Sequence, residues 1–184
     1  MLLAACPGPA PVPPECGVFA GDPSAPLQIE PVGLVPGGQY APLDDGATLQ
    51  LTQPAQGGFV LYVGARARNL DPCGVTLSAQ LLDPGSGPPL TNLDRRRADL
   101  LARTADGWFL PGAAHLTSEF PNVPACPDAL GRGIDGRDAV LEIVLTDARG
   151  RTARATRKVV PRCTAVSAIG CSCVCGPDYR PGGC

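Results

Sequence analysis

The clearest hydrophobic pattern lies in residues 138–161. Apolar and polar residues alternate there on both sides of a short polar segment, 147–150. Successive side chains of a strand leave opposite faces, so a period of two is typical of a strand with one buried face. Asp147 can accept a hydrogen bond from the backbone two residues on, and Gly150 can adopt a positive φ. The pattern therefore predicts a β-hairpin with its turn at 147–150.

The same alternation recurs upstream, which predicts further strands to cover the apolar face of the hairpin. No segment shows the 3.6-residue period of a helix. The glycine- and proline-rich stretches between the runs predict a turn at 69–74, a loop at 83–89 and a long loop at 121–136. The predicted strands are 27–30 (on an edge, because prolines flank it), 48–52, 59–68 and 75–81, with weaker ones at 98–104, 107–110 and 115–120.

Short strands separated by turns predict an all-β fold, an antiparallel sandwich of about seven strands. The hairpin, with Asp147-x-x-Gly150-Arg151-x-Ala153 between its strands, resembles the last hairpin of bacterial immunoglobulin-like domains. The resemblance implies an immunoglobulin-like sandwich over residues 27–162. The order Cys73, Trp108, Cys126 is that of a true immunoglobulin domain, but the spacing differs.

Charge and composition narrow the range of partners. The formal net charge is −2, which gives no long-range attraction to nucleic acid or to anionic lipid. Aromatic residues make up only 4% of the chain, too few to provide a surface on which bases stack. No apolar run approaches the roughly 20 residues that span a bilayer. We therefore expect no nucleic-acid partner and no membrane-spanning segment.

The first residues suggest a different route to the membrane. Leu3-Ala4-Ala5-Cys6 resembles the lipobox of bacterial lipoproteins, and a proline-rich spacer follows at once. The resemblance implies that 1–5 is the remnant of a signal peptide and that Cys6 carries a diacylglyceryl and acyl (palmitate) anchor. It also implies that 6–26 is an extended tether. Because a full leader needs basic and apolar regions before the cysteine, the sequence is expected to begin inside it.

The residue after Cys6 is Pro7 and not Asp, which in enteric bacteria favours sorting to the outer membrane. The alternative for the whole motif is a chance Leu-Ala-Ala-Cys in a chain rich in alanine and leucine.

The cysteine count supports export. The chain has nine cysteines, and setting Cys6 aside leaves an even eight. So many cysteines favour disulfides in an oxidising compartment. A Cys73–Cys126 bridge is predicted, which would close a loop of about 54 residues and contribute ~4 kcal/mol. Three further bridges are expected to tie the tail, 163–184, to itself and to the segment around Cys16, with the pairing open among Cys16, Cys163, Cys171, Cys173, Cys175 and Cys184.

Cys171-Ser-Cys173-Val-Cys175 allows a second interpretation. Thiolates two residues apart could hold copper(I) or zinc. The usual zinc signature is Cys-x-x-Cys, and the single histidine, His115, is far away in sequence. Disulfides are therefore favoured, and no cofactor is expected. A metal site formed by these three cysteines remains the alternative.

Four other groups have a functional and a structural interpretation, and the structural one is favoured each time. No Gly-x-Ser-x-Gly elbow accompanies the single histidine, so no enzyme is predicted. The functional interpretation is given first and the structural one second: Arg95-Arg96-Arg97 (an anion-binding patch, or a solvated loop), His115 with Ser118 (nucleophilic catalysis, or no catalytic role), Asp135 to Asp138 (a calcium site, or a turn) and Trp108-Phe109 (an exposed binding platform, or core packing).

The sequence thus predicts an exported, non-catalytic bacterial lipoprotein. It is expected in the cell envelope, on the outer membrane facing the periplasm or the cell surface, and to act as a binding or structural module. An envelope protein is the expected partner, of unknown identity. The alternative function is envelope binding of copper or zinc through Cys171, Cys173 and Cys175.

Overall fold

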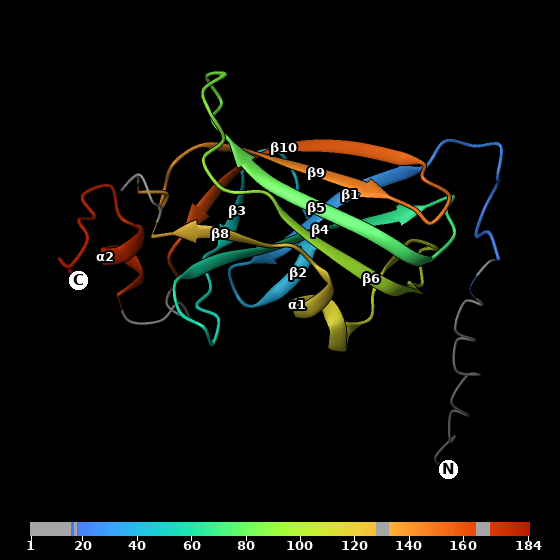
Figure 1. Ribbon diagram of the computed structural model, residues 1–184, viewed down its shortest axis with the longest axis horizontal. Helices are drawn as coiled ribbons and strands as arrows, with labels where there is room; N and C mark the ends of the chain where they lie inside the picture. Colours follow the sequence, from blue (N-terminus) through green and yellow to red (C-terminus); the bar gives the residue numbers. More distant parts are fainter. Residues whose placement is uncertain (1–15, 17, 128–132, 165–169) are drawn as a thin grey trace, which may run out of the picture.

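The computed structural model describes residues 16, 18–127, 133–164 and 170–184. These residues form a mostly β protein, which confirms the all-β prediction (Figure 1). The described chain has ten strands, where about seven were predicted. They are β1 (Gln28–Val35), β2 (Gln39–Pro42), β3 (Ala47–Gln50), β4 (Phe59–Arg68), β5 (Cys73–Leu82), β6 (Asp94–Arg103), β7 (Phe109–Pro111), β8 (Asn122–Cys126), β9 (Ala139–Thr146) and β10 (Thr152–Arg162).

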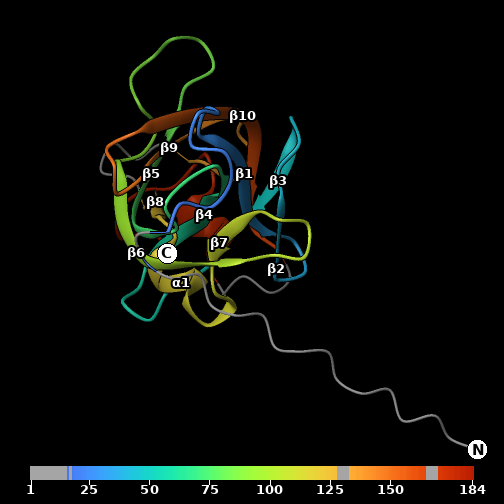
Figure 2. The same cartoon turned by 90° about the vertical axis from the view of Figure 1, so that its right-hand side faces the viewer.

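The strands belong to one sheet, in the order β2-β1-β4-β7-β6-β5-β9-β10-β3, with β8 paired to β4 off this path. Strand β6 joins the two halves: its first part pairs with β5 and its last three residues with β7. The sheet is curved, and β1 lies against β10 and β3 from the other end of the strand order (Figure 2). The sheet therefore encloses apolar side chains along its inner surface.

The predicted hairpin is confirmed. Strands β9 and β10 pair antiparallel from Thr146 opposite Thr152 to Ala139 opposite Val159. The inward side chains of β9 are fully buried. In the turn, the Asp147 carboxylate accepts the backbone N–H of Arg149 and of Arg151. The hairpin lies between β5 and β3, so both of its edges are covered.

The core follows the predicted alternation. The inward residues of β4 and β5 are at most 3% exposed, and Leu49 on β3 and Leu51 just after it are fully buried. Buried residues from both halves of the sheet form one cluster. The inward residues on β4 and β5 are Phe59, Leu61, Val63, Ala65, Ala67, Val75, Leu77, Ala79 and Leu81.

The expectation of a purely antiparallel sheet is wrong at one pair, because β3 runs parallel to β10. The loop after β2 brings the chain beside the middle of β10, where Asp45 accepts the N–H of Lys158 and Gly46 donates to the Lys158 carbonyl. From there β3 runs beside the remaining residues of β10 in the same direction, from Ala47 opposite Val159 to Gln50 opposite Arg162. The sheet is mixed for this reason.

The first strand is longer than predicted and does not lie on an edge. Strand β1 has eight residues and pairs with β4 on one side and β2 on the other. The Pro31 carbonyl accepts the N–H of Leu43, beyond the last residue of β2. The nitrogen of Pro31 points to the same side, so the missing N–H removes no bond to β4. The short β2 is the edge strand instead.

Three segments were assigned wrongly from sequence. The arginine run 95–97, expected in a loop, lies within β6. The long loop expected at 121–136 contains β8, which pairs with β4. The weak strand expected at 115–120 is helical: η1 (Ala113–His115) leads into α1 (Leu116–Glu119). A second short helix, α2 (Cys171–Cys175), lies in the tail.

Candidate functional site: the cysteine-rich tail and its pocket

Four disulfides join the eight cysteines of the described chain, Cys16–Cys73, Cys126–Cys175, Cys163–Cys171 and Cys173–Cys184. The expectation of disulfide bonds is thereby confirmed. The tail is bonded to itself twice and to the end of β8 once. It has no bond to Cys16, contrary to the expectation.

The predicted Cys73–Cys126 bridge is wrong. Cys126 lies opposite Phe59, at the start of β4, whereas Cys73 follows the end of β4 at Arg68. A ten-residue strand is about 33 Å long, while bridged Cα atoms lie about 4.4–6.8 Å apart. Neither cysteine lies in a loop, since Cys73 begins β5 and Cys126 ends β8. The two cysteines are therefore at opposite ends of the molecule.

Helix α2 is fixed against the segment before β9. The N–H groups of Ile134 and Asp135 both donate to the Cys175 carbonyl, at 2.9 Å each. The Asp135 carboxylate accepts the N–H of Cys163, so it orients the start of the tail. A Cβ atom on Gly133 would lie 2.2 Å from the Gly176 carbonyl oxygen, which shows how closely the two backbones approach.

Asp135 therefore has a structural contact, in line with the turn interpretation. Among the described residues, Asp135 and Asp138 do not belong to a group whose ligand atoms converge on a metal position. The same search brings three other side chains together, Cys163, Cys171 and Cys175, with sulfurs within 4.8 Å of one another.

The two sides of α2 differ. Cys171 and Cys175 are one helical turn apart, 3% and 0% exposed, and their sulfurs are 4.0 Å apart. Cys173 lies between them in sequence and points to the opposite side, where it is bonded to Cys184. The predicted trio Cys171, Cys173 and Cys175 is therefore not brought together. Cys163 takes the place of Cys173 beside the other two.

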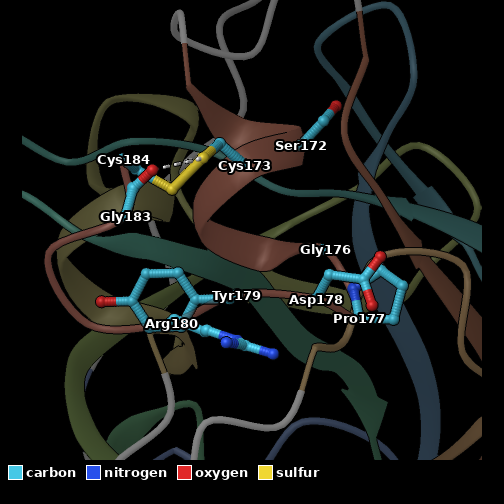
Figure 3. Close-up of a pocket in the computed structure, with 9 residues that line it drawn as sticks. All are labelled: Ser172, Cys173, Gly176, Pro177, Asp178, Tyr179, Arg180, Gly183 and Cys184. Carbon is cyan, nitrogen blue, oxygen red and sulfur yellow. Dashed lines mark hydrogen bonds between the residues drawn. A yellow bond between two sulfur atoms is a disulfide. The ribbon is translucent and has the colours of Figure 1, made fainter.

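The outer side of α2 borders a pocket of about 330 Å³ (Figure 3). The Cys173–Cys184 disulfide closes the loop that forms it, and Tyr179 lines the same pocket. Asp178, Tyr179 and Arg180 are the lining residues with ionisable side chains. Such a lining can recognise a ligand by charge and hydrogen bonding. Its lining residues are Ser172, Cys173, Gly176, Pro177, Asp178, Tyr179, Arg180, Gly183 and Cys184.

The sequence analysis missed this pocket. The turn residues on either side of Asp178–Arg180, Gly176-Pro177 and Pro181-Gly-Gly183, could have indicated a compact loop. Nothing in the sequence indicated that the loop folds back on α2.

Trp108 is neither a core residue nor a free binding platform. It is half-buried, and the guanidinium groups of Arg66 and Arg68 lie 4.8 and 4.7 Å from its ring centre. Arg66 also forms ion pairs with Glu30 and Asp106. The ring is thus held by cation–π contacts on the outer surface of β4. Phe109, the other half of the predicted pair, is buried, in line with the core interpretation.

The arginine run is not a single patch. Arg95 and Arg97 are exposed on β6, and Arg97 pairs with Asp99 at 3.2 Å. Arg96 points to the other side and pairs with Asp94 at 2.8 Å. The alternation of the strand therefore divides the three charges between two faces, and carboxylates neutralise two of them.

His115 and Ser118 do not form a catalytic pair. The Ser118 hydroxyl donates to the backbone carbonyl of His115, so it does not engage the imidazole. The imidazole Nδ1 lies 3.8 Å from Glu119. Burial raises the pKa of Glu119 although His115 opposes the shift. Sequence reasoning gave no indication of this half-buried carboxylate.

The predicted lipidation residue Cys6 and most of the predicted tether lie outside the described residues. Within the part of the chain that the structure describes, no helix is long and apolar enough to cross a bilayer. Comparison with known proteins found no matching protein family and no curated protein that matches the chain.

Proposed function

We propose that the protein is an exported bacterial lipoprotein, anchored through Cys6 to the outer membrane, that acts as a non-catalytic binding module. The observation that supports this most is the pairing of cysteines. Every cysteine of the described chain belongs to a disulfide. Such pairing is typical of an oxidising compartment. The ninth cysteine, Cys6, is the one that the lipobox resemblance selects for the lipid.

The proposed fold is an immunoglobulin-like sandwich. Two groups of strands support it: β1, β2, β4, β7 and β8 on one side, and β3, β5, β9 and β10 on the other, with β6 shared between them. Side chains of both groups meet in one core, as they do when two sheets pack face to face.

The positions of the two ends support a binding role. The Cys16–Cys73 bridge attaches the N-terminal segment beyond the end of β4. The Cys126–Cys175 bridge attaches the tail at the start of β4, about 33 Å away along the strand. Figure 1 shows the described residues before β1 and the tail at opposite ends of the molecule. Because the tether joins the body through Cys16 at one end, the pocket at the other end is the surface that we propose for a partner.

The direct test is metabolic labelling with an alkyne analogue of palmitate in a bacterial host, followed by membrane fractionation. The native gene with its upstream sequence should give a labelled protein in the membrane fraction. Cys6→Ser should lose both the label and the membrane association, while the double variant Cys173→Ser/Cys184→Ser keeps both. A membrane-bound, labelled Cys6→Ser protein, or an unlabelled wild type, would contradict the proposal.

A further inference from the structure

Two disulfides meet on the buried side of α2. Cys171 and Cys175 lie one turn apart, and the Cys163 sulfur completes a group within 4.8 Å. Cys126 is bonded to Cys175 and is 4% exposed. Three sulfurs, those of Cys163, Cys171 and Cys175, are thus grouped, and the Cys126 sulfur adjoins the group through its bond to Cys175.

We propose that, when a dithiol reduces both of these disulfides, Cys126, Cys163, Cys171 and Cys175 bind one zinc ion. This goes beyond the proposed binding function and concerns a different side of α2 from the pocket. Structural zinc sites are tetrahedral, and four thiolates at about 2.3 Å from the metal place the sulfurs about 3.8 Å apart. The Cys171 and Cys175 sulfurs are already 4.0 Å apart. Each bonded pair has to separate by about 1.7 Å to reach the same spacing. The Cys126 sulfur, which lies outside the group of three, also has to turn towards Cys163 and Cys171.

The chemistry balances as two separate steps. Each disulfide takes two electrons and two protons from a dithiol, which becomes a disulfide, so four thiols result. Binding of Zn²⁺ to four thiols then releases four protons, because the thiolate is the ligand. The oxidised protein has no free thiol at these positions, so the site is closed until it is reduced.

The surroundings hold the four residues in place without the disulfides. The Cys175 carbonyl accepts the N–H groups of Ile134 and Asp135, and the Asp135 carboxylate accepts the N–H of Cys163. Cys126 is the last residue of β8, whose pairing with β4 fixes its backbone. Reduction therefore removes the S–S bonds but leaves the backbone contacts that position the ligands.

The chain offers a matched control on the same helix. The Cys163–Cys171 and Cys173–Cys184 bridges span similar sequence separations, 8 and 11 residues. Removing either one therefore changes the chain entropy of the unfolded protein by a similar amount. Only the first removal takes two ligands from the proposed site.

The experiment uses the full chain, purified oxidised and then reduced with a phosphine without oxygen. Zinc is titrated in competition with a chromophoric chelator, and Co²⁺ serves as a spectroscopic probe of tetrahedral thiolate coordination. Wild type and Cys173→Ser/Cys184→Ser should bind one equivalent with the cobalt spectrum of a tetrathiolate site. Cys163→Ser/Cys171→Ser should lose that spectrum and bind zinc at least about tenfold more weakly. Equal affinity of the two double variants, or equal zinc binding by the oxidised wild type, would overturn the proposal.

Two further measurements exclude binding by an unfolded chain. The zinc-loaded protein must give the far-ultraviolet circular dichroism of a β protein; a zinc-loaded but unfolded chain would count against the site. Zinc must also protect Cys126, Cys163, Cys171 and Cys175 from alkylation while Cys173 and Cys184 react. Protection of Cys173 in place of Cys163 would refute the ligand set.

Discussion

Asp147 provides the sharpest stability prediction, because its carboxylate is entirely buried at the turn of the β9–β10 hairpin. It accepts the backbone N–H groups of Arg149 and Arg151. It also accepts the Nε and Nη2 groups of Arg151, at 2.9 and 2.8 Å. Nη2 of Arg151 also donates to the backbone carbonyl of Asn69. Asp147 thus connects the hairpin turn to the end of β4.

The cost of Asp147→Asn follows from these contacts. Asparagine keeps one acceptor oxygen, loses the charge, and turns an NH₂ group towards the donors. Removal of one partner from a buried ion pair costs about 3–5 kcal/mol. The Arg151 side chain is 30% exposed, so water can solvate part of the charge that remains. We therefore expect the lower end, about 3 kcal/mol, which lowers Tm by roughly 6–12 °C in a protein of this size.

The measurement is urea unfolding with the disulfides intact, followed by the fluorescence of Trp108. Asp99→Asn is the matched control: Asp99 also pairs with an arginine, Arg97, but it is 87% exposed. The control should cost less than about 1 kcal/mol. If Asp147→Asn cost no more than Asp99→Asn, the assignment of the buried ion pair as the main support of the turn would be refuted.

Three smaller predictions concern the region around α1. Gly64→Ala should destabilise the fold by about 1–3 kcal/mol in thermal unfolding, since its Cβ would lie 2.4 Å from the Phe120 ring; no change would mean that the ring does not pack there. Burial raises the pKa of Tyr40 to about 12, with Tyr62 adding to the shift. Because the unfolded chain loses this proton first, the free energy of unfolding should fall as pH rises from about 10 towards 12. In an absorbance titration, Tyr40→Phe should remove the last phenol to ionise. Glu119→Gln should stabilise the protein, and the gain should grow as pH rises through the range in which carboxyl groups ionise. The reason is that the raised pKa of Glu119 makes its charged form unfavourable in the folded protein. A gain in stability that does not depend on pH would contradict this.

Much of the fold could be predicted because alternation reports which side of a strand is buried. It gave β4, β5 and the β9–β10 hairpin with their inward residues. Strand β8 was not predicted because it is only five residues long and contains Pro124. The run 95–97 was misassigned because consecutive arginines hide the alternation between the two faces of β6.

The candidate site could be predicted only in part. The cysteine composition indicated disulfides, but the partners depend on which ends of β4 the strands β5 and β8 adjoin. That depends on how the strands are connected in the sheet, and the spacing of the cysteines along the sequence does not reveal it. Likewise, Cys171 and Cys173 look like neighbours in sequence, yet a helix turns them to different sides. The short helix itself gave no periodic signal.

The intact mass of the membrane-bound protein tests the account most directly. The gene is expressed with its upstream sequence in a bacterial host, and the protein is alkylated without reduction before it is weighed. The account predicts a chain that begins at Cys6, is heavier by the diacylglyceryl and acyl groups, and carries no alkyl adduct. A chain that keeps the residues before Cys6 and takes up several alkyl groups would contradict both the lipid anchor and the four disulfides.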